Sequence, residues 1–268
     1  MNEKINLLIH SVITMVIIIL LYSLISNLYF IVGKENIPPL FRRFISPTVL
    51  PPIQKIFSSM YSLFFKGIIW EHISISLIRV VSGYSIGVLI GFTIGFMMAI
   101  SRRTDLLLSP IYSFARAIPP IAFVTLFILW FGIGEFSKIL LITYGVCMTM
   151  IVPTYHGVRD IPAIYIKASK MLGLNGKILF SKVVIPASLP RIFEGLRMSL
   201  MSAWGLIVAA ELIASFKGVG YILISAQWTL DTPMVIVGVI IVGILGYILD
   251  GTVKMFSFKF TPWIERRR

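Results

Sequence analysis

Long apolar runs limit what this chain can fold into more than any other feature. A helix crosses the hydrocarbon core of a bilayer with about 20 mainly apolar residues. Six segments of the sequence approach or exceed this length: residues 5–33, 80–101, 117–134, 139–158, 198–216 and 232–249. The pattern predicts an all-α, polytopic membrane protein with six transmembrane helices.

The composition agrees with this interpretation and argues against other classes. The chain is 57% hydrophobic and only 13% charged, with a formal net charge of +13. In a soluble protein this charge would indicate nucleic-acid binding, but basic cytoplasmic loops of a membrane protein explain it better. With Cys147 as its single cysteine, the chain offers neither a disulfide framework nor a thiolate metal cluster.

The first apolar run is longer than the core of a cleavable signal peptide, and no small-residue cleavage site follows it. We therefore expect it to remain as the first span. In residues 34–72, repeated prolines and basic residues preclude a regular membrane helix, although residues 54–65 favour a short amphipathic helix on the membrane surface. This divides the chain into a first span with its linker (1–72), the main transmembrane domain (73–262) and a basic tail (263–268).

The distribution of Lys and Arg predicts the orientation. With the amino terminus inside, inward segments hold about twice as many basic residues as outward ones, and the segments 102–103 and 159–191 follow the rule for short loops. Both termini are therefore expected in the cytoplasm. Of the basic residues within spans, Arg116 is expected to extend to the cytoplasmic interface, with a position lining a pathway as the alternative.

One span carries glycine at every fourth position. On a helix this spacing places the glycines near one stripe, where the backbone of a neighbouring helix can approach closely. The stripe consists of Gly83, Gly87, Gly91 and Gly95. It indicates helix packing rather than chemistry.

Two features interrupt the apolar spans. Pro119 and Pro120 break the third span, which is tolerated where neighbouring groups or a cavity satisfy the freed carbonyls. Glu211 lies within the fifth span, and intramembrane carboxylates are candidate functional residues. We favour a structural pair within the bundle for Glu211, with a pathway role as the alternative, and we expect Glu194 and Arg197 to pair with each other.

A mixed polar and apolar stretch follows the fourth span. Asp160 and Pro162 suit the start of a short helix. Its apolar positions recur with helical period at Ile164, Ala168, Met171 and Leu172. The polar residues Lys167, Ser169 and Lys170 are expected elsewhere on its surface.

The stretch then turns back toward the membrane. Gly173 suits the position after a helix end, and Asn175 can cap a second helix that Pro186 and Pro190 would end. The result is a helical hairpin with an apolar face directed at the cytosol. Periodicity alone leaves two partners open for this face, a protein or the anionic lipid surface.

The sequence lacks the marks of an enzyme. Neither Gly33-Lys34 nor Gly176-Lys177 belongs to a phosphate-binding GxxxxGK[ST] loop. The histidines, His10, His72 and His156, are far apart in sequence, and no catalytic triad or metal-ligand set stands out. We expect no catalytic residue, no metal and no cofactor.

The hairpin resembles a known signature. Permease subunits of binding-protein-dependent ABC importers carry Glu-Ala-Ala, three residues, Gly, nine residues, Ile-x-Leu-Pro; this chain has Lys-Ala-Ser at 167–169, Gly173, and Val-Val-Ile-Pro at 183–186. The segments 116–120 and 129–134 are similar to the nitrate, sulfonate, taurine and bicarbonate branch. The resemblance covers roughly residues 45–260. It departs from the family at Lys167, where an acid is usual, and at Ser169.

The resemblance implies a type I ABC importer permease in a bacterial cytoplasmic membrane, working as a homodimer in the lipid bilayer. Its partners would be two copies of an ABC ATPase, an extracytoplasmic solute-binding protein and no nucleic acid. The ATPase would dock on a coupling helix formed by Ile164, Lys167, Ala168, Ser169, Met171, Leu172, Gly173 and Asn175. The solute would be a small anion such as a sulfonate, taurine or nitrate.

Two alternatives remain from the sequence. The same importer class also carries vitamin precursors such as thiamine pyrimidines and riboflavin. A protein of another class, an ion-coupled carrier or channel, would use intramembrane acids such as Glu211 and Asp250 to bind its ion. Carriers usually show internal repeats, and none is evident between the two halves of this chain.

Overall fold

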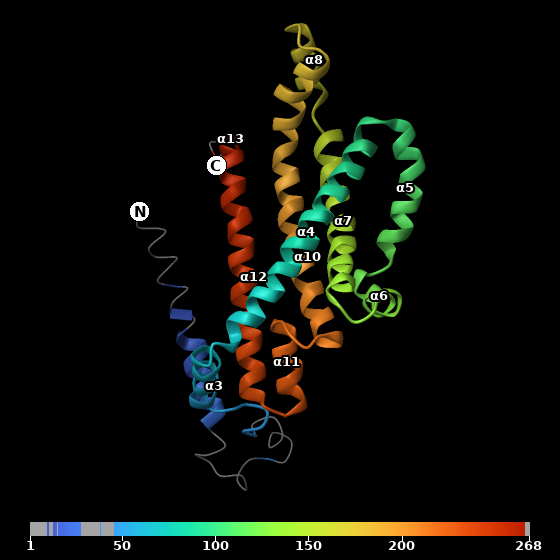
Figure 1. The fold of residues 1–268 in the computed structure, drawn as a ribbon. Helices are drawn as coiled ribbons and strands as arrows, with labels where there is room; N and C mark the ends of the chain where they lie inside the picture. Colours follow the sequence, from blue (N-terminus) through green and yellow to red (C-terminus); the bar gives the residue numbers. More distant parts are fainter. Residues whose placement is uncertain (1–9, 11–12, 15, 28–37, 39–45, 266–268) are drawn as a thin grey trace. The chain divides into compact units, whose positions relative to one another are not determined.

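The computed structural model describes residues 10, 13–14, 16–27, 38 and 46–265 (Figure 1). These residues form helices and connecting turns, and no strand occurs among them. The chain separates into two compact units: residues 1–70 with 222–240, and residues 71–221 with 241–268. The all-α prediction is confirmed.

The helices follow one another with short connections. In chain order they are α3 (Ile53–Phe65), α4 (Ile68–Ile100), α5 (Arg102–Ala117), a 3-10 turn (Pro120–Ala122), α6 (Phe123–Phe131), α7 (Glu135–Arg159), α8 (Ala163–Met171), α9 (Gly176–Leu179), a π-helical turn (Phe180–Val184), α10 (Ile185–Ala214), α11 (Val219–Trp228), α12 (Thr232–Phe260) and α13 (Pro262–Glu265). An apolar helix at Val16–Asn27 precedes them.

The smaller unit holds α3, at the place where the sequence predicts an amphipathic helix. Phe57, Tyr61 and Phe65 are exposed along one face of α3, whereas Leu63 is buried. Contact of this face with a membrane surface stays a prediction. In the same unit, the Thr232 hydroxyl donates to the Thr48 carbonyl oxygen at 2.5 Å.

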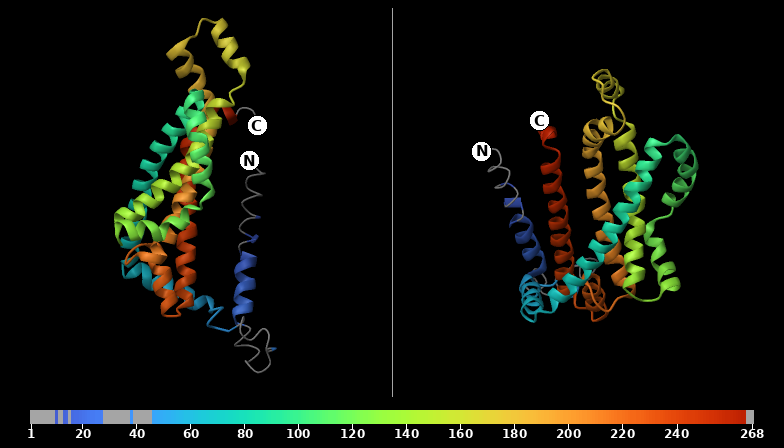
Figure 2. Two further views of the ribbon diagram at one scale, coloured as in Figure 1. Left: turned by 90° about the vertical axis from the view of Figure 1, so that its right-hand side faces the viewer. Right: turned by 45° about the horizontal axis from the view of Figure 1, so that its top comes forward.

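The larger unit is built around α7 and α10, which share its most extensive helix–helix contact. Its core includes Val80, Ile142, Val146, Ala203 and Ile207 from α4, α7 and α10. Figure 2 shows the hairpin of α8 and α9 projecting from one end of these helices. Burial of these aliphatic side chains holds the three long helices together as one body.

The glycine stripe of α4, from Gly83 to Gly95, lies directly against α7. A Cβ atom at Gly83 would lie 2.6 Å from the Ile142 Cβ atom, and one at Gly95 would lie 2.5 Å from the Ile151 carbonyl oxygen. Cβ atoms at the two intervening glycines, Gly87 and Gly91, would each lie 2.7 Å from a carbonyl oxygen of α7. No larger residue fits this contact without separating the two helices.

Four described helices are long and apolar enough to cross a membrane: Ile68–Ile100, Glu135–Arg159, Gly176–Ala214 and Thr232–Phe260. The pair Arg102–Ala117 and Pro120–Phe131 would be a fifth span, bent by 71°. The bend confirms the break predicted at Pro119 and Pro120. The first predicted span, residues 5–33, lies partly outside the described residues, so the count of six stays a prediction.

One predicted helix end is wrong. Pro186 and Pro190 were expected to end the second arm of the hairpin, but the helix continues from Gly176 to Ala214. Pro186 lies in the first turn of α10, where a missing N–H costs little. The preceding π-helical turn, Phe180–Val184, changes the hydrogen-bond register just before that proline. Pro190 lies inside α10, which continues past it to Ala214.

Candidate functional site

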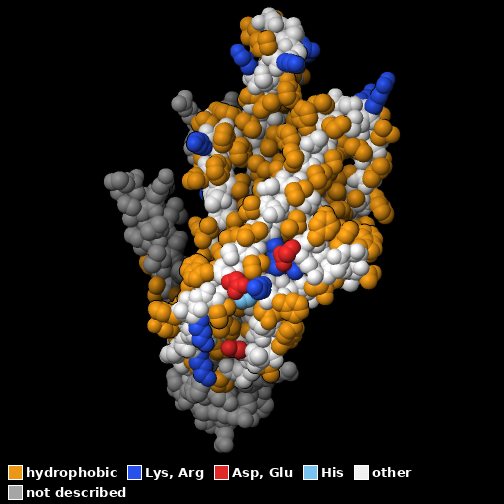
Figure 3. Space-filling model, viewed as in Figure 1, with side chains coloured by type: hydrophobic (Ala, Val, Ile, Leu, Met, Phe, Trp, Pro, Cys, Tyr) orange, Lys and Arg blue, Asp and Glu red, His pale blue; other side chains and the backbone are white. Residues whose placement is uncertain are grey.

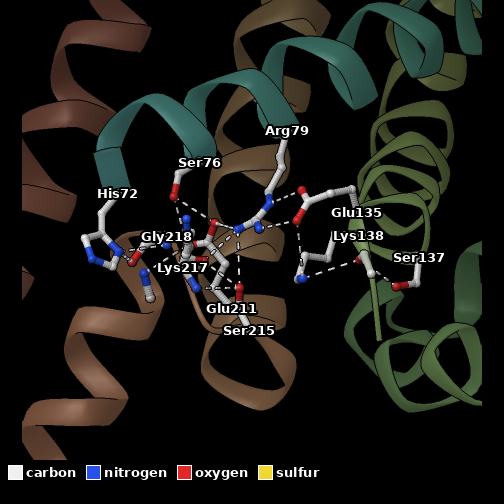
Figure 4. A network of polar contacts seen from close by, with 12 residues as sticks. His72, Ser76, Arg79, Glu135, Ser137, Lys138, Glu211, Ser215, Lys217 and Gly218 are labelled. Carbon is white, nitrogen blue, oxygen red and sulfur yellow. Dashed lines mark hydrogen bonds and ion pairs between the residues drawn. The ribbon is translucent and has the colours of Figure 1, made fainter. Parts of the chain in front are cut away.

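A buried polar network lies where α7 begins and α10 ends, at the end of the larger unit opposite the hairpin. Figure 4 shows it from close by. The Glu211 carboxylate is 0% exposed and accepts hydrogen bonds from Ser76 Oγ at 2.7 and 2.9 Å, Arg79 Nη1 at 2.7 Å and the Gly220 amide at 2.9 Å. A buried charge is tolerated when it is paired and hydrogen-bonded in this way. Glu211 therefore has a structural partner within the bundle.

Arg79 connects this carboxylate to a second acid. Its side chain is 3% exposed, and Nε and Nη2 each donate to Glu135 at 2.5 Å, a bidentate arrangement. Arg79 Nη1 also donates to the Lys217 carbonyl oxygen at 2.8 Å. One guanidinium group thus joins α4, α7, α10 and the α10–α11 loop.

The loop after α10 closes over the same network. The Gly218 amide donates to His72 Nδ1 at 2.9 Å, and Gly218 has a φ of 120°, a value that L-residues rarely adopt. A Cβ atom at Gly218 would lie 2.3 Å from Glu211 Oε1. Glycine is therefore required at this position for both backbone angle and space.

The predicted pair of Glu194 with Arg197 is wrong. Arg197 forms a bidentate ion pair with Asp250 of α12, at 2.8 and 2.6 Å, whereas Glu194 pairs with Arg191 at 3.3 Å. Arg197 points across to α12, so its partner lies 53 residues away in sequence. Sequence spacing alone favoured the near neighbour.

A cavity of about 640 Å³ lies between α5, α7 and α10, toward the hairpin end of α7. Its lining includes the charged side chains Arg116, Asp160, Arg191 and Glu194 together with His156, and Arg191 pairs with Glu194 at 3.3 Å. His156 pairs with Asp160 at 3.0 Å, but no acid among the described residues pairs with Arg116. Of the two residues considered for a pathway, Arg116 thus lines a cavity and Glu211 is enclosed in the network.

The hairpin is formed by α8, α9 and the turn between them (Figure 1). Gly173, with a φ of 80°, follows the end of α8. Its amide donates to the Lys170 carbonyl oxygen at 3.0 Å, and the Leu174 amide donates to the Ser169 carbonyl oxygen at 3.0 Å. These two bonds form a Schellman motif, which satisfies the last carbonyls of α8 and reverses the chain.

The apolar face of α8 is exposed. Ile164, Met171 and Leu172 are 67%, 89% and 80% exposed, and Ala168 and Lys167 are also exposed. Side chains of this kind lose favourable free energy in water and are normally covered by a partner. The hairpin therefore presents an apolar surface that no residue in the described part of the chain covers.

Three details of the hairpin differ from expectation. Ser169 is buried rather than on the surface, with its hydroxyl donating to the Tyr165 carbonyl oxygen at 2.7 Å, because α8 packs against α9 and the π-helical turn. Asn175 precedes α9 in an extended conformation, but its side chain makes no capping bond. Asp160 pairs with His156, and Pro162 precedes α8 instead.

Comparison with known proteins identifies the family. The model of the family described as "binding-protein-dependent transport system inner membrane component" matches residues 87–262 of this chain. The chain belongs to this family. The resemblance read from the hairpin signature is confirmed.

The relatives that the chain matches are named as permeases. The chain is 36% identical over 219 residues to a protein described as an aliphatic sulfonates transport permease of Bacillus subtilis, covering 82% of this chain and 79% of the relative. It is 34% identical to the taurine transport system permease of Escherichia coli, covering 82% of each chain. It is 32% identical to the bicarbonate transport system permease of Synechococcus elongatus, covering 75% of this chain and 69% of the relative.

Solved structures of ABC transporters share the fold. An inward-facing methionine ABC transporter matches with a TM-score of 0.59 and 18% identity, covering 74% of this chain and 96% of that chain. An amino acid ABC transporter matches with a TM-score of 0.59 and 14% identity, covering 75% and 96%. The fold is that of the permeases of ABC importers.

Some residues of the network were not found by sequence reasoning. Ser76 and Arg79 lie on α4, whereas Glu135 lies on α7, far away in the chain. Only the presence of opposite charges at or within apolar spans, Arg79 and Glu211, offered a signal. No group of three or more His, Cys, Asp or Glu residues in the described part of the chain is placed to hold a metal ion. What the network does in the structure is join α4, α7, α10 and the α10–α11 loop through the Arg79 guanidinium group.

Proposed function

We propose that this chain is the permease subunit of an ATP-driven ABC importer and forms the membrane pathway for a small anion delivered by a solute-binding protein. The observation that carries the proposal is the exposed apolar face of α8, at the tip of a hairpin that keeps the spacing of the importer signature. Such a face requires a protein partner, and in this family that partner is the ATPase.

The substrate class rests on the relatives and on the cavity. The relatives named above carry aliphatic sulfonates, taurine and bicarbonate, all of which bear or can bear a negative charge. Arg116 supplies a cation without an acidic partner to the cavity wall. An anion passing this cavity would gain a charge-assisted hydrogen bond there. Vitamin precursors, the alternative substrates, would gain less binding free energy from such a site.

The mechanism follows from the position of the hairpin. Two copies of the chain would enclose the pathway, with hairpins and both termini in the cytoplasm of a bacterial cell and one ATPase subunit beneath each hairpin. ATP binding closes the ATPases and shifts the population from the inward-open to the outward-open state, because the closed ATPases hold the two hairpins at a different separation.

The polar network would make the helices of the larger unit move together. Arg79 ties α4, α7 and α10 together at the end opposite the hairpin, and the glycine stripe holds α4 on α7. A displacement of the hairpin would therefore move these helices as one body and open or close the cavity beside Arg116.

An ion-coupled carrier fits the structure less well. Its coupling ion would need an available intramembrane acid, but Glu211 pairs with Arg79 at 2.7 Å and Asp250 pairs with Arg197 at 2.6 Å. Each carboxylate is already neutralised by a guanidinium group. The importer remains the better explanation of the same residues.

The test is assembly and transport with the ATPase encoded beside the permease gene. The double substitution Met171→Asp with Leu172→Asp is expected to abolish co-purification of the ATPase and ATP-driven uptake of taurine or an alkanesulfonate into proteoliposomes. Leu230→Asp is the matched control, since Leu230 is 77% exposed and lies in the α11–α12 turn. Full assembly and uptake by the double variant would refute the docking role.

A further inference from the structure

The hairpin carries positive charge only. From residue 161 to residue 193 the sequence contains no Asp or Glu, and its cations are Lys167, Lys170, Lys177, Lys182 and Arg191. Among the residues that the structure describes, the pair of Arg191 with Glu194 is the only ion pair that any of them forms. The four lysines are exposed, and Figure 3 shows basic side chains beside apolar ones at the tip.

The two lysines of α8, Lys167 and Lys170, lie beside the exposed apolar face of that helix. On α8, Lys167 comes three residues after Ile164 and four before Met171, so its side chain lies next to both on the helix surface. Lys170 lies three residues after Lys167, about one helical turn further along α8. A partner that covers Ile164 and Met171 must therefore also meet the Lys167 ammonium group.

The helix that leads away from this tip is longer than a bilayer is thick. The continuous helix Gly176–Ala214 has 39 residues, which corresponds to about 58 Å. A bilayer with its headgroups is about 40–45 Å thick. The hairpin projects beyond the ends of α4 and α5 (Figure 1), and the potential of an anionic membrane falls off within about 8–10 Å at physiological ionic strength. A protein fits this surface better than a lipid headgroup does.

We infer that the ATPase surface receiving this hairpin is an apolar groove with an acidic rim, with a carboxylate facing Lys167. The inference rests on the proposed function and adds the chemistry of the partner. An apolar centre with a charged rim is the usual arrangement of a specific interface, and complementary charge decides which partner is accepted. In the signature that the hairpin resembles, an acid stands in place of Lys167, so a groove suited to that acid would not suit Lys167.

This charge arrangement would let the permease discriminate between different ATPases. An ATPase with a basic residue opposite Lys167 would place two cations side by side, and their repulsion would weaken binding. A cell with several importers of this family could in this way keep this permease with its own ATPase. The apolar face supplies affinity, and the lysines supply selection.

The experiment measures the affinity of the purified permease, in lipid nanodiscs, for the ATPase encoded beside it. Wild-type affinity is expected to fall as NaCl rises from 50 to 500 mM. Lys167→Glu is expected to weaken binding at least about tenfold at low salt, and Lys167→Gln less, because reversal adds repulsion to the lost attraction. Lys259→Glu, an exposed lysine at the end of α12, is the matched control and should bind as wild type. Replacing the ATPase acid that faces Lys167 by lysine should restore binding of the Lys167→Glu permease, but it should weaken binding of the wild-type permease.

The possible failures can be told apart. Salt-independent binding, together with wild-type affinity of Lys167→Glu, would overturn the acidic groove while leaving the importer function intact. A response of Lys167→Glu to the fraction of anionic lipid, with unchanged ATPase affinity, would overturn it in favour of a lipid partner. No binding of the ATPase by the wild type at any salt concentration would instead refute the proposed function.

Discussion

Arg79 and Glu211 show how a charge can lie inside an apolar bundle. The carboxylate accepts hydrogen bonds from three donors, Ser76, Arg79 and the Gly220 amide, at 2.7 to 2.9 Å, and the guanidinium group is shared with Glu135. Lys138, 4.0 Å from Glu135, supplies a second cation for the two carboxylates, so the cost of removing these charges from water is offset. The pair holds the bundle together as long as every member is present.

Removing one member should therefore be far more damaging than removing a surface charge. Glu211→Ala is expected to destabilise the protein by about 3–5 kcal/mol, because it breaks a buried pair. Glu194→Ala is the control: its partner Arg191 is 65% exposed, and loss of an exposed pair costs about 0–1 kcal/mol. Thermal unfolding in detergent, followed by circular dichroism, measures both.

The conservative variant separates structure from transport. Glu211→Gln keeps the shape and part of the hydrogen bonding, so we expect reduced stability and, where the protein still folds, retained uptake. A variant of wild-type stability without uptake would instead place Glu211 in the pathway.

At the level of single elements, the sequence predicted those parts that depend on local geometry. The period of Ile164, Ala168, Met171 and Leu172 and the position of Gly173 follow from helix geometry and from backbone angles that glycine adopts easily. The continuation of the helix past Pro186 and Pro190 was not predictable in the same way. A π-helical turn, for which residues 180–184 carry no distinctive composition, precedes Pro186, and Pro190 lies inside α10.

The contact of α4 with α7 gives a prediction with an internal control. Gly87→Ala is expected to destabilise the protein by about 1–3 kcal/mol, since its Cβ atom would lie 2.7 Å from the Thr143 carbonyl oxygen. Gly205→Ala in α10 meets nothing within 4 Å and should be neutral or stabilising by up to about 1 kcal/mol, because alanine favours a helix. Equal effects of the two substitutions on the unfolding temperature would contradict the close approach.

For the whole molecule, the class and family were readable from the sequence, but the connections between distant segments were not. Apolar runs and basic loops indicated a helical membrane protein, and the spacing from residue 167 to Pro186 indicated the permease family. Arg79 meets Glu135 and Glu211, and Arg197 meets Asp250, only after the helices pack. A single sequence contains no spacing rule for such partners.

The cavity beside Arg116 provides the prediction that concerns transport itself. If an anion passes this wall, Arg116→Gln should lower uptake of taurine or an alkanesulfonate by about tenfold, the effect of losing one charge-assisted hydrogen bond of roughly 1.4 kcal/mol or more. Arg116→Lys keeps the charge and should retain more uptake. Both variants should bind the ATPase as wild type does, since Arg116 lies at the end of α5 and the docking face lies on α8.

Arg191→Gln supplies the comparison, because Arg191 lines the same cavity but is paired with Glu194 at 3.3 Å. Its loss removes little free positive charge, so uptake should fall less than in Arg116→Gln. The readout is the initial rate of ATP-driven uptake into proteoliposomes at saturating solute-binding protein. Wild-type rates in Arg116→Gln would place this guanidinium group at the lipid interface, where it would anchor α5 without meeting the solute.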